Sequence, residues 1–506
     1  MFLGLDLGTS KVKAVLAERN GRIVARGSAP VKIFPVAGDG VEQDVEDIWA
    51  ATRSAIGQVA EERDLSSVQA IGVSSQGGAL VICDGRGQPV GRVISWLDGR
   101  GRTYDDEITR ELGSKWFARH TGHGASGLSV GQLLRLRRES PEILSRPNRI
   151  GFVGDVIVFR LCGRPAHDAT SLSIAMLFNP SLRAADPELL ENLCISEDQL
   201  PELLSPWKRA GTLRNEVAES MALPPGIPVS PAVHDQYASA LGVGAIHKGD
   251  VMFGAGTAWV LLAAVEPVQD SRPYGQGSEE PTSSPIEPVI PEAFVSTHLM
   301  EGLYGQMLSL TNGASSLNWA MDLLGLDRRT PSDIDTMLEA VPAGSDGLRF
   351  WPLLAPGGGA GLVPGTPGGL RGLRLSHRAA HIIRAVVEGL ALELARYLRF
   401  LTDAGIAVQR LVMCGGAAAS RVTPQIIADA TGLSIECSAE SDTSALGAAV
   451  IARALTEPTA EPAGLSEEMR PQVRLFRPGG DAALYRQLFN EYVASLPLAG
   501  SEKANQ

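Results

Sequence analysis

The chain opens with a short apolar stretch that carries one acid and a glycine turn, Phe2-Leu3-Gly4-Leu5-Asp6-Leu7-Gly8-Thr9-Ser10. Residues 12–16 alternate as in a strand, and the pair Asn20-Gly21 favours a type I′ turn, so a three-stranded meander is expected. A glycine turn leaves backbone N–H groups open to phosphate oxygens. Asp6 is a carboxylate that can hold a hydrated divalent cation beside them. The same pattern also fits an ordinary surface hairpin.

A second stretch, Met252-Phe253-Gly254-Ala255-Gly256-Thr257, repeats this layout. Gly256-Thr257 is in register with Gly8-Thr9, whereas Gly254 stands where the first copy has Asp6. A repeat of this kind indicates a duplicated fold. Two phosphate-type turns, of which one carries an acid, predict that a nucleotide binds between the two halves of the duplicated fold. The alternative is that the Gly-Thr turn recurs by chance.

Length and charge restrict the classes of protein that remain. A chain of 506 residues exceeds what a single core supports, so two or more domains are expected. The net charge of −12 disfavours nucleic acid and acidic membranes as partners. We find no signal peptide and no apolar run of the roughly 20 residues that a membrane helix needs, so a cytoplasmic protein is expected. The five scattered cysteines indicate neither a disulfide framework nor a metal site.

Polar residues follow three of the strands that the sequence predicts. Gln76 ends the strand 68–75, and Asp98 follows the strand 93–96. Because ligands bind at strand ends in α/β sheets, both are candidates to bind sugar hydroxyls, with ordinary turn residues as the alternative. Asp235 ends a third strand and opens a helix, which suits either a general base or a helix N-cap.

The second half of the chain contains further loops and helices. Residues 266–295 are rich in Pro, Ser and Glu and predict an exposed, mobile insertion. Amphipathic or apolar patterns predict helices at 309–324 and 377–401. Gly415-Gly416-Ala417 follows a strand at 411–414, where small residues admit either a flat adenine or close helix–strand packing. A last helix of small residues starts near Asp442.

These ordered motifs resemble the FGGY family of carbohydrate kinases over nearly the whole chain. Within the family the chain is most similar to xylulokinases, with glycerol kinases next. The resemblance implies an α/β fold of two duplicated ribonuclease-H-like (actin/hexokinase-type ATPase) domains around a central cleft, here residues 1–243 and 244–495, with a flexible tail at 496–506. The motifs that carry it are Gly4–Ser10, Val41–Asp44, Ile94–Arg100, Asp235-Gln236, Gly256-Thr257, Gly415–Ala417 and Ala445–Ala449.

The resemblance also implies an activity: transfer of the γ-phosphate of ATP to a hydroxyl of a ketose or polyol, with Mg²⁺-ATP in the interdomain cleft. Asp235 matches the catalytic base, and Asp6 with Asp235 matches the Mg²⁺ site. The other implied ligands form two groups: acceptor-binding Gln76, Gly77, Gly78, Asp98, His234 and Gln236; and ATP-binding Gly8, Thr9, Ser10, Lys11, Gly256, Thr257, Gly415, Gly416, Ala417 and Ser420. A homodimer is compatible with the resemblance, and neither nucleic acid nor membrane is an expected partner.

Three departures bear on the acceptor. Xylulokinases carry Gln-Met-His-Gly where this chain has Gln76-Gly77-Gly78-Ala79, so the imidazole that contacts the ketose is missing. His234 replaces a glycine before the base. The Gly-Glu-Arg-Thr-Pro loop appears as Pro356-Gly357-Gly358-Gly359-Ala360, without either charge. Neither Asp6 nor Asp235 is affected, so kinase chemistry is expected while xylulose as the acceptor is not established.

Other functions fit parts of the pattern. Glycerol, a tetritol or another ketose are alternative acceptors. A non-catalytic sugar or nucleotide sensor would bind without turnover, and the intact Asp6 and Asp235 argue against it. An actin-like ATPase has no need of the clusters at 96–98 and 234–236. A dinucleotide-dependent oxidoreductase is disfavoured because the opening glycines do not follow GxGxxG spacing.

Overall fold

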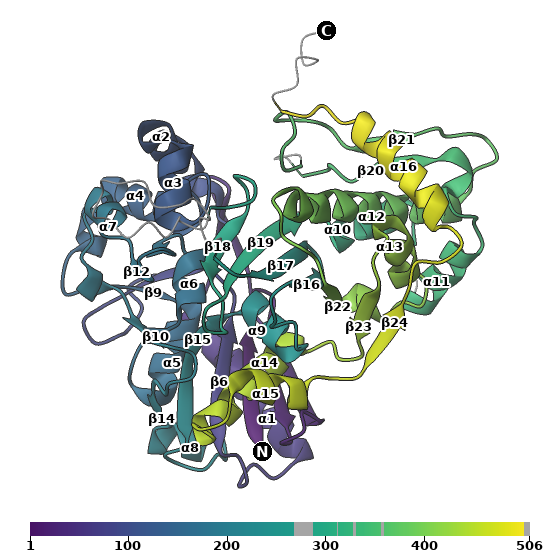
Figure 1. Ribbon diagram of the computed structural model, residues 1–506. Helices are drawn as coiled ribbons and strands as arrows, with labels where there is room; N and C mark the ends of the chain where they lie inside the picture. The colour runs from purple at the N-terminus through teal and green to yellow at the C-terminus, as the bar shows by residue number, and fades with distance from the viewer. Residues whose placement is uncertain (268–286, 311, 327–329, 356–358, 500–506) are drawn as a thin grey trace, which may run out of the picture. The chain divides into compact units, whose positions relative to one another are not determined.

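The computed structural model describes residues 1–267, 287–310, 312–326, 330–355 and 359–499 (Figure 1). The chain divides into two compact units. The first comprises the described parts of Met1–Lys248, Ala264–Gln306 and Asp442–Arg470, and the second those of Gly249–Ala263, Met307–Ser441 and Pro471–Gln506. The units therefore do not follow sequence order, because residues 442–470 belong to the first. The domain boundary at 243/244 divides the chain into consecutive halves and stays a prediction.

The main sheet of the first unit has the predicted meander at one side. Its order is β13-β10-β15-β6-β1-β2-β3, with β1, β2 and β3 antiparallel and β6 and β15 parallel to β1. Apolar residues on these strands form a continuous core with the helices that cover them. The strands are β1 (Phe2–Leu7), β2 (Lys11–Ala17), β3 (Ile23–Pro30), β6 (Ala70–Ser75), β10 (Ala166–His167), β13 (Glu202–Leu203) and β15 (Pro228–His234).

The turn between β2 and β3 is not the type I′ turn that Asn20-Gly21 predicts. The backbone N–H of Gly21 donates to the carbonyl of Glu18, and that of Glu18 donates to Arg22. Gly21 has a φ of 79°, whereas Asn20 is not among the residues with positive φ. A type I′ turn needs positive φ at both central residues. The loop is therefore the longer hairpin form, in which a glycine follows an ordinary turn.

The sheet of the second unit repeats this topology. Its strands run in the order β18-β19-β17-β16-β22-β23-β24, where β18 is Phe294–Thr297. In both sheets the first strand of the repeat, β1 or β16, lies between the antiparallel strand that follows it and a parallel strand from later in the chain. This confirms the predicted duplicated α/β fold. The strands are β16 (Asp250–Ala255), β17 (Trp259–Val265), β19 (Tyr304–Leu310), β22 (Arg410–Cys414), β23 (Ile435–Ser438) and β24 (Val473–Phe476).

A smaller sheet of the first unit carries several predicted site residues. Its order is β4-β5-β8-β7-β9, and the loop after β8 delivers Trp96 and Asp98. Helices α4 (Ser129–Glu139) and α6 (Ala169–Ile174) contribute apolar residues to the second hydrophobic core of this unit. The strands are β4 (Phe34–Val36), β5 (Gly40–Gln43), β7 (Leu80–Cys83), β8 (Val93–Ile94) and β9 (Arg149–Phe152).

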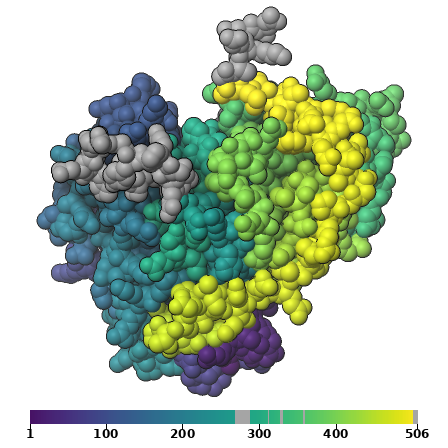
Figure 2. Space-filling view, viewed as in Figure 1, coloured from purple at the N-terminus to yellow at the C-terminus, as the bar shows by residue number. Residues whose placement is uncertain are grey.

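Helix α1 (Val45–Glu62) covers β2 and β3, and Asp44 caps it by accepting a hydrogen bond from the N–H of Glu46. Helices α9 (Asp235–Gly242) and α14 (Thr443–Thr456) pack against each other and against β6 and β15. Figures 1 and 2 show helices α14 and α15 (Pro462–Met469), which come late in the chain, among elements from its N-terminal part. The first unit is thus completed by a late segment of the chain.

Helix α14 lies so close to its neighbours that only glycine fits at the contacts. A Cβ on Gly4 of β1 would lie 1.9 Å from the carbonyl oxygen of Ala445. A Cβ on Gly447 of α14 would lie 1.8 Å from the carbonyl oxygen of Ala238 in α9. Real carbon–oxygen contacts are far longer, so a methyl group at either position would force the elements apart.

Several predicted elements differ at their ends or were missed. The predicted helix 309–324 begins later, as α10 (Ala314–Leu323), because residues 304–310 extend a strand in the sheet. Helix α15 and strand β24 were not predicted. The predicted helix 377–401 agrees with α12 (Ala379–Asp403), and α13 (Thr423–Thr431) follows the second glycine turn. Most of the predicted insertion (268–286), part of the glycine loop (356–358) and most of the predicted tail (500–506) lie outside the described residues.

Across the described ranges, no helix is both long and apolar enough to cross a membrane.

Candidate active site

Two acidic residues project from the same edge of the main sheet in the first unit. Asp6 on β1 is paired in register with Ser74 on β6, and Ser74 is paired with Val233 on β15. Asp235 follows two residues later as the first residue of α9. The carboxyl ends of parallel strands meet at one edge, where α/β proteins bind ligands. The structure therefore brings Asp6 and Asp235 to this edge with a single strand between them.

The Asp6 carboxylate lies in a partly buried, polar setting. Ser444 at the start of α14 donates a hydrogen bond to it at 3.2 Å. Lys13, opposite Asp6 on β2, is ion-paired with Asp442 at 2.9 Å. Burial, followed by the like charge of Asp235, raises the pKa of Asp6 to about 7, although Lys13 and Ser444 act in the other direction.

Asp235 is held by its two sequence neighbours. Gln236 donates from Nε2 to its Oδ1 at 3.1 Å, and His234 Nε2 lies 3.3 Å from the same oxygen. Burial raises the pKa of Asp235 to about 6, while its side chain keeps 28% of its surface exposed. Residue 234, and not Asp235, occupies the N-cap position of α9. A reachable carboxylate with a pKa near neutrality is suited to accept a proton.

The pair of acids fits a hydrated magnesium ion. Mg²⁺ is held in proteins through oxygen atoms, commonly by one or two carboxylates together with several waters. The charge of Asp235 raises the pKa of Asp6, so a cation near both would relieve that repulsion. Groups of three or more His, Cys, Asp or Glu residues with metal-ligand geometry do not occur among the described residues. The donor set therefore matches an ion that retains most of its waters.

The loop Gln76–Gly78 is packed against His234. The side chain of His234 is 6% exposed, and burial lowers its pKa to about 3, so the imidazole is neutral. A Cβ on Gly77 would lie 2.8 Å from Cδ2 of His234 and 2.3 Å from Cγ2 of Ile174. Glycine at residue 77 and histidine at residue 234, both departures from the xylulokinase pattern, are therefore linked. The imidazole of His234 and the side chain of Ile174 occupy the space that a side chain at residue 77 would need.

Four hydrogen bonds connect the first glycine turn with this loop, with Gln43 and with Trp96. Thr9 Oγ1 lies 2.9 Å from Gln76 Oε1 and 2.9 Å from Trp96 Nε1. Gln76 Nε2 donates to Gln43 Oε1 at 3.0 Å, and Gln43 Nε2 donates to the carbonyl of Thr9 at 2.8 Å. Gln43 and Trp96 were not among the predicted ligands, although both stand in the motifs 41–44 and 94–100. Ser10 and Lys11 follow the turn and are exposed.

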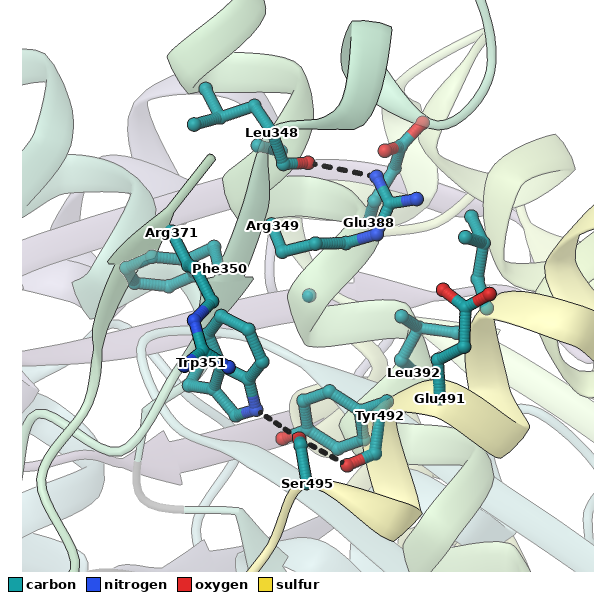
Figure 3. Close-up of a pocket in the computed structure, with 13 residues that line it drawn as sticks. Leu348, Arg349, Phe350, Trp351, Arg371, Glu388, Leu392, Glu491, Tyr492 and Ser495 are labelled. Atoms are coloured by element: carbon teal, nitrogen blue, oxygen red, sulfur yellow. Dashed lines mark hydrogen bonds between the residues drawn. The ribbon is translucent and has the colours of Figure 1, made fainter. Parts of the chain in front are cut away.

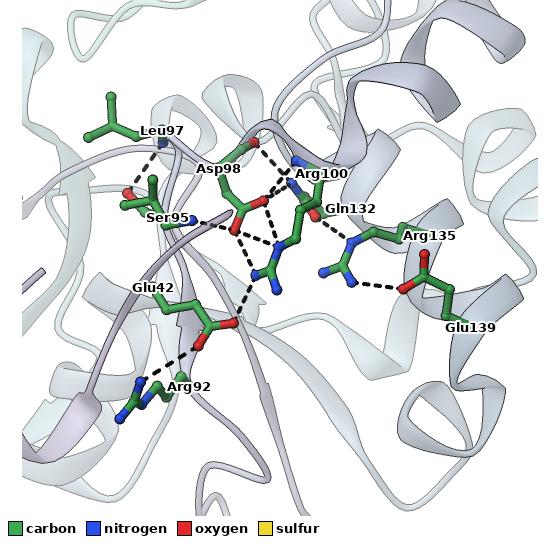
Figure 4. A network of polar contacts seen from close by, with 10 residues as sticks. Glu42, Arg92, Ser95, Leu97, Asp98, Arg100, Gln132, Arg135 and Glu139 are labelled. Carbon is green, nitrogen blue, oxygen red and sulfur yellow. Dashed lines mark hydrogen bonds and ion pairs between the residues drawn. The ribbon is translucent and has the colours of Figure 1, made fainter. Parts of the chain in front are cut away.

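The carboxylate of Asp98 is buried and already hydrogen-bonded, whereas a residue that binds a sugar hydroxyl has to be reachable. Its side chain has no exposed surface, and Arg100 contacts both of its carboxylate oxygens at 2.7–3.0 Å. The N–H of Val41 and the amide of Gln132 also donate to it (Figure 4). Although burial acts to raise its pKa, the hydrogen bonds from Arg100 and Val41 lower it. These contacts make Asp98 an internal anchor, and its role as an acceptor ligand stays a prediction.

In the second unit, Gly256 and Thr257 form the turn between β16 and β17. Their carbonyls accept hydrogen bonds from the N–H groups of Ala314 and Ser315 at the start of α10. Within the part of the chain that the structure describes, the Thr257 hydroxyl makes no hydrogen bond, and the residue is exposed. The turn thus presents an unoccupied hydroxyl next to the N-terminus of a helix, where anions are favoured.

The second glycine turn of this unit follows β22. Gly415 has a φ of 88°, and its Cβ would lie 3.0 Å from the backbone of Ala255, so it needs to be glycine. A Cβ on Gly416 would meet no atom within 4 Å, so this backbone is open to a flat ligand. Ser420, by contrast, accepts from the N–H of Thr423, the first residue of α13, and donates to Asp335. The nucleotide-binding roles of these residues stay predictions.

A cavity of about 180 Å³ lies elsewhere in the second unit, lined by β20 (Arg349–Trp351), α12 and α16 (Ala482–Ala494) (Figure 3). Trp351 Nε1 donates to Ser495 Oγ at its edge. None of the predicted acceptor- or nucleotide-binding residues lines it. The volume of a cavity therefore does not identify the candidate site, which is defined by its polar groups.

Comparison with known proteins agrees with the geometry. The sequence matches the N-terminal domain of the FGGY family of carbohydrate kinases over residues 1–242 and the C-terminal domain over residues 282–455. The chain is 27% identical to a xylulose kinase of Escherichia coli over 90% of both chains. It is 26% identical to a gluconokinase of Bacillus licheniformis, over 89% of this chain and 86% of that one.

A crystal structure of a xyloylose kinase from Brucella ovis superposes with a TM-score of 0.84 at 26% identity, covering 97% of this chain and 98% of the other. The relatives differ in the acceptor that they are named for, at nearly equal identity, so they do not select one acceptor for this chain. Both family domains match in order and together span most of the sequence. The chain belongs to the FGGY family of carbohydrate kinases.

Proposed function

We propose that the protein transfers the γ-phosphoryl group of ATP to a hydroxyl of a ketose or polyol, in the manner of a xylulokinase. The observation that carries the proposal is the pair Asp6 and Asp235 at one sheet edge, both with pKa values raised toward neutrality. Glycerol, a tetritol or another ketose remain alternative acceptors for the same chemistry. The residue pattern at 76–78 and 234 differs from that of xylulokinases and supports no single sugar.

In the proposed step, Asp235 takes the proton of the acceptor hydroxyl. The hydroxyl oxygen forms a bond to the γ-phosphorus, and the bond to the bridging oxygen breaks, so ADP leaves with that electron pair. Phosphoryl transfer relies on positioning and charge neutralisation more than on covalent chemistry. Mg²⁺, when bound near Asp6 and Asp235, supplies positive charge to the phosphates. Gln236 and His234 orient the Asp235 carboxylate through contacts to Oδ1.

Roles on the nucleotide side are assigned to the second unit. Gly256 and Thr257 present backbone and hydroxyl groups suited to phosphate oxygens, and Gly415-Gly416-Ala417 presents an open backbone suited to adenosine. A homodimer is suggested by the family resemblance alone, and light scattering of the purified chain tests it.

The first experiment is a screen for ADP release over pentuloses, hexuloses, tetritols and glycerol. ADP release is expected to depend on one class of acceptor, which identifies the substrate. Asp235→Asn keeps the shape of the side chain but cannot take a proton, so turnover is expected to fall about 10³-fold while ATP still binds by calorimetry. Asp198→Asn, at an exposed carboxylate paired with Arg146, is the matched control. Retention of most turnover in Asp235→Asn would refute the proposed base.

A further inference from the structure

The hydrogen bonds around Thr9 fix the direction in which its hydroxyl donates. The carbonyl of Thr9 can only accept, so the atom of Gln43 that faces it at 2.8 Å is the amide nitrogen. The oxygen Oε1 of Gln43 therefore faces Gln76, and the amide nitrogen of Gln76 donates to it at 3.0 Å. Gln76 therefore turns Oε1 toward Thr9, and the hydroxyl hydrogen of Thr9 points at that oxygen.

A separate contact, with Trp96, also indicates that the Thr9 hydroxyl donates its hydrogen to Gln76. An indole N–H only donates, and Trp96 Nε1 lies 2.9 Å from Thr9 Oγ1. Thr9 must accept there, which leaves its single hydrogen for Gln76. Phosphate oxygens of ATP are acceptors at neutral pH, so they would have to displace Gln76 to receive this hydrogen. Gln43 and Gln76 are 0% and 4% exposed, and breaking hydrogen bonds in such a buried network is costly.

We propose that the Thr9 hydroxyl is a positioning group of the acceptor site, and that it does not bind phosphate. Thr9 links the backbone of the first turn to the loop that begins at Gln76, a predicted acceptor ligand, and to the indole of Trp96, which stands two residues before the predicted acceptor ligand Asp98. Trp96 is 42% exposed, so the hydrogen bond to Thr9 sets the orientation of a ring that solvent or a ligand can reach. The backbone N–H groups of the turn stay available to phosphate. This inference rests on the proposed kinase function and specifies how its acceptor side is held.

The test separates acceptor from nucleotide kinetics. Thr9→Val keeps the shape of the side chain and removes the hydroxyl, so the KM of the acceptor is expected to rise about tenfold. The KM of ATP and kcat are expected to stay within about threefold. Thr9→Ser restores the hydroxyl and is expected to restore the acceptor KM. Trp96→Phe removes the N–H donor of that pair together with part of the ring, and combining it with Thr9→Val is expected to add less than the sum of the two effects.

Two further variants serve as references. Thr257→Val, at the matching position of the second turn, is expected to raise the KM of ATP about three- to tenfold and to leave the acceptor KM unchanged. Thr52→Val removes a buried hydroxyl that bonds only within α1, at Ile48, and is expected to change neither KM. Thermal unfolding of each variant excludes a loss of folded protein as the cause.

The inference is overturned if Thr9→Val raises the KM of ATP and spares the acceptor, or if it changes neither. If the wild-type protein releases no ADP with any acceptor, the proposed function fails instead. In that case titration of ATP by calorimetry still tests whether the Thr9 hydroxyl binds phosphate. An affinity unchanged within about threefold in Thr9→Val supports the inference, and a tenfold weakening refutes it.

Discussion

The turns Gly8-Thr9 and Gly256-Thr257 have the same backbone pattern and different surroundings. The first stands beside Asp6 and carries a threonine whose hydroxyl is engaged by Gln76 and Trp96. The second has Gly254 in place of the acid, and the Thr257 hydroxyl makes no hydrogen bond within the described residues. A duplicated turn can therefore diverge in function through the side chains around it while its own residues stay the same. Three changes to the chain or its medium test this difference.

The largest effect is expected where the two turns differ in charge. Asp6→Asn removes the carboxylate and keeps the shape, and we expect kcat to fall about a hundredfold or more, because charge neutralisation of phosphates is a main source of rate in phosphoryl transfer. Mg²⁺ titrations of acceptor-dependent ADP release measure it. An unchanged kcat and an unchanged Mg²⁺ requirement would remove Asp6 from the site and make the turns equivalent.

The two acids of the first unit should also make activity and stability depend on pH. Asp235 has to be ionised to take a proton, and burial raises its pKa to about 6, so kcat/KM is expected to fall as pH drops below about 6. The raised pKa of Asp6, about 7 against an ordinary 3.8, means that the folded state binds more protons in this window. Its contribution to stability is therefore present at low pH and lost as pH rises toward about 7. Urea unfolding of wild type and Asp6→Asn between pH 4 and pH 8 should show a stability difference that varies with pH; parallel curves would contradict the assignment.

The smallest effect concerns the glycines themselves. A Cβ on Gly8 would lie 2.9 Å from the carbonyl oxygen of Lys11, whereas one on Gly256 would meet only Ala258, at 3.6 Å. Gly8→Ala is expected to lower Tm by about 2–4 °C, and Gly256→Ala to change it by less than about 1 °C. Calorimetric melting of both variants measures the contrast. Equal shifts would mean that the two turns have the same steric limits.

Much of the fold follows from local patterns in the sequence. The repeated turn and the small-residue turn after β22 were predicted from residues close together in the chain, and the structure contains both. The strand at 304–310 was predicted in part as helix, because its pairing partners lie far away in sequence. Sheet neighbours override local propensity in such segments.

The positions of the two predicted acids follow from the sequence, whereas the contacts around them do not. Asp6 and Asp235 stand at strand ends, which periodicity reveals, and the structure places both at one edge. Gln43 and Ser444 act through contacts with residues 34 and 438 positions away, for which the sequence contains no local signal. The sequence also predicts Asp98 as an acceptor ligand, and it contains no local signal for the contact with Arg100, because a loop acid after a strand has the same pattern with or without such a contact.

The return of residues 442–470 to the first unit has a consequence for biosynthesis. Ser444, which donates to Asp6, leaves the ribosome long after β1, and at the usual 5–20 residues per second the delay amounts to tens of seconds. Throughout that interval Gly4 and its neighbours lack the helix that covers them. A nascent chain halted before residue 442 therefore displays an apolar sheet face, which makes it a substrate for chaperones and proteases.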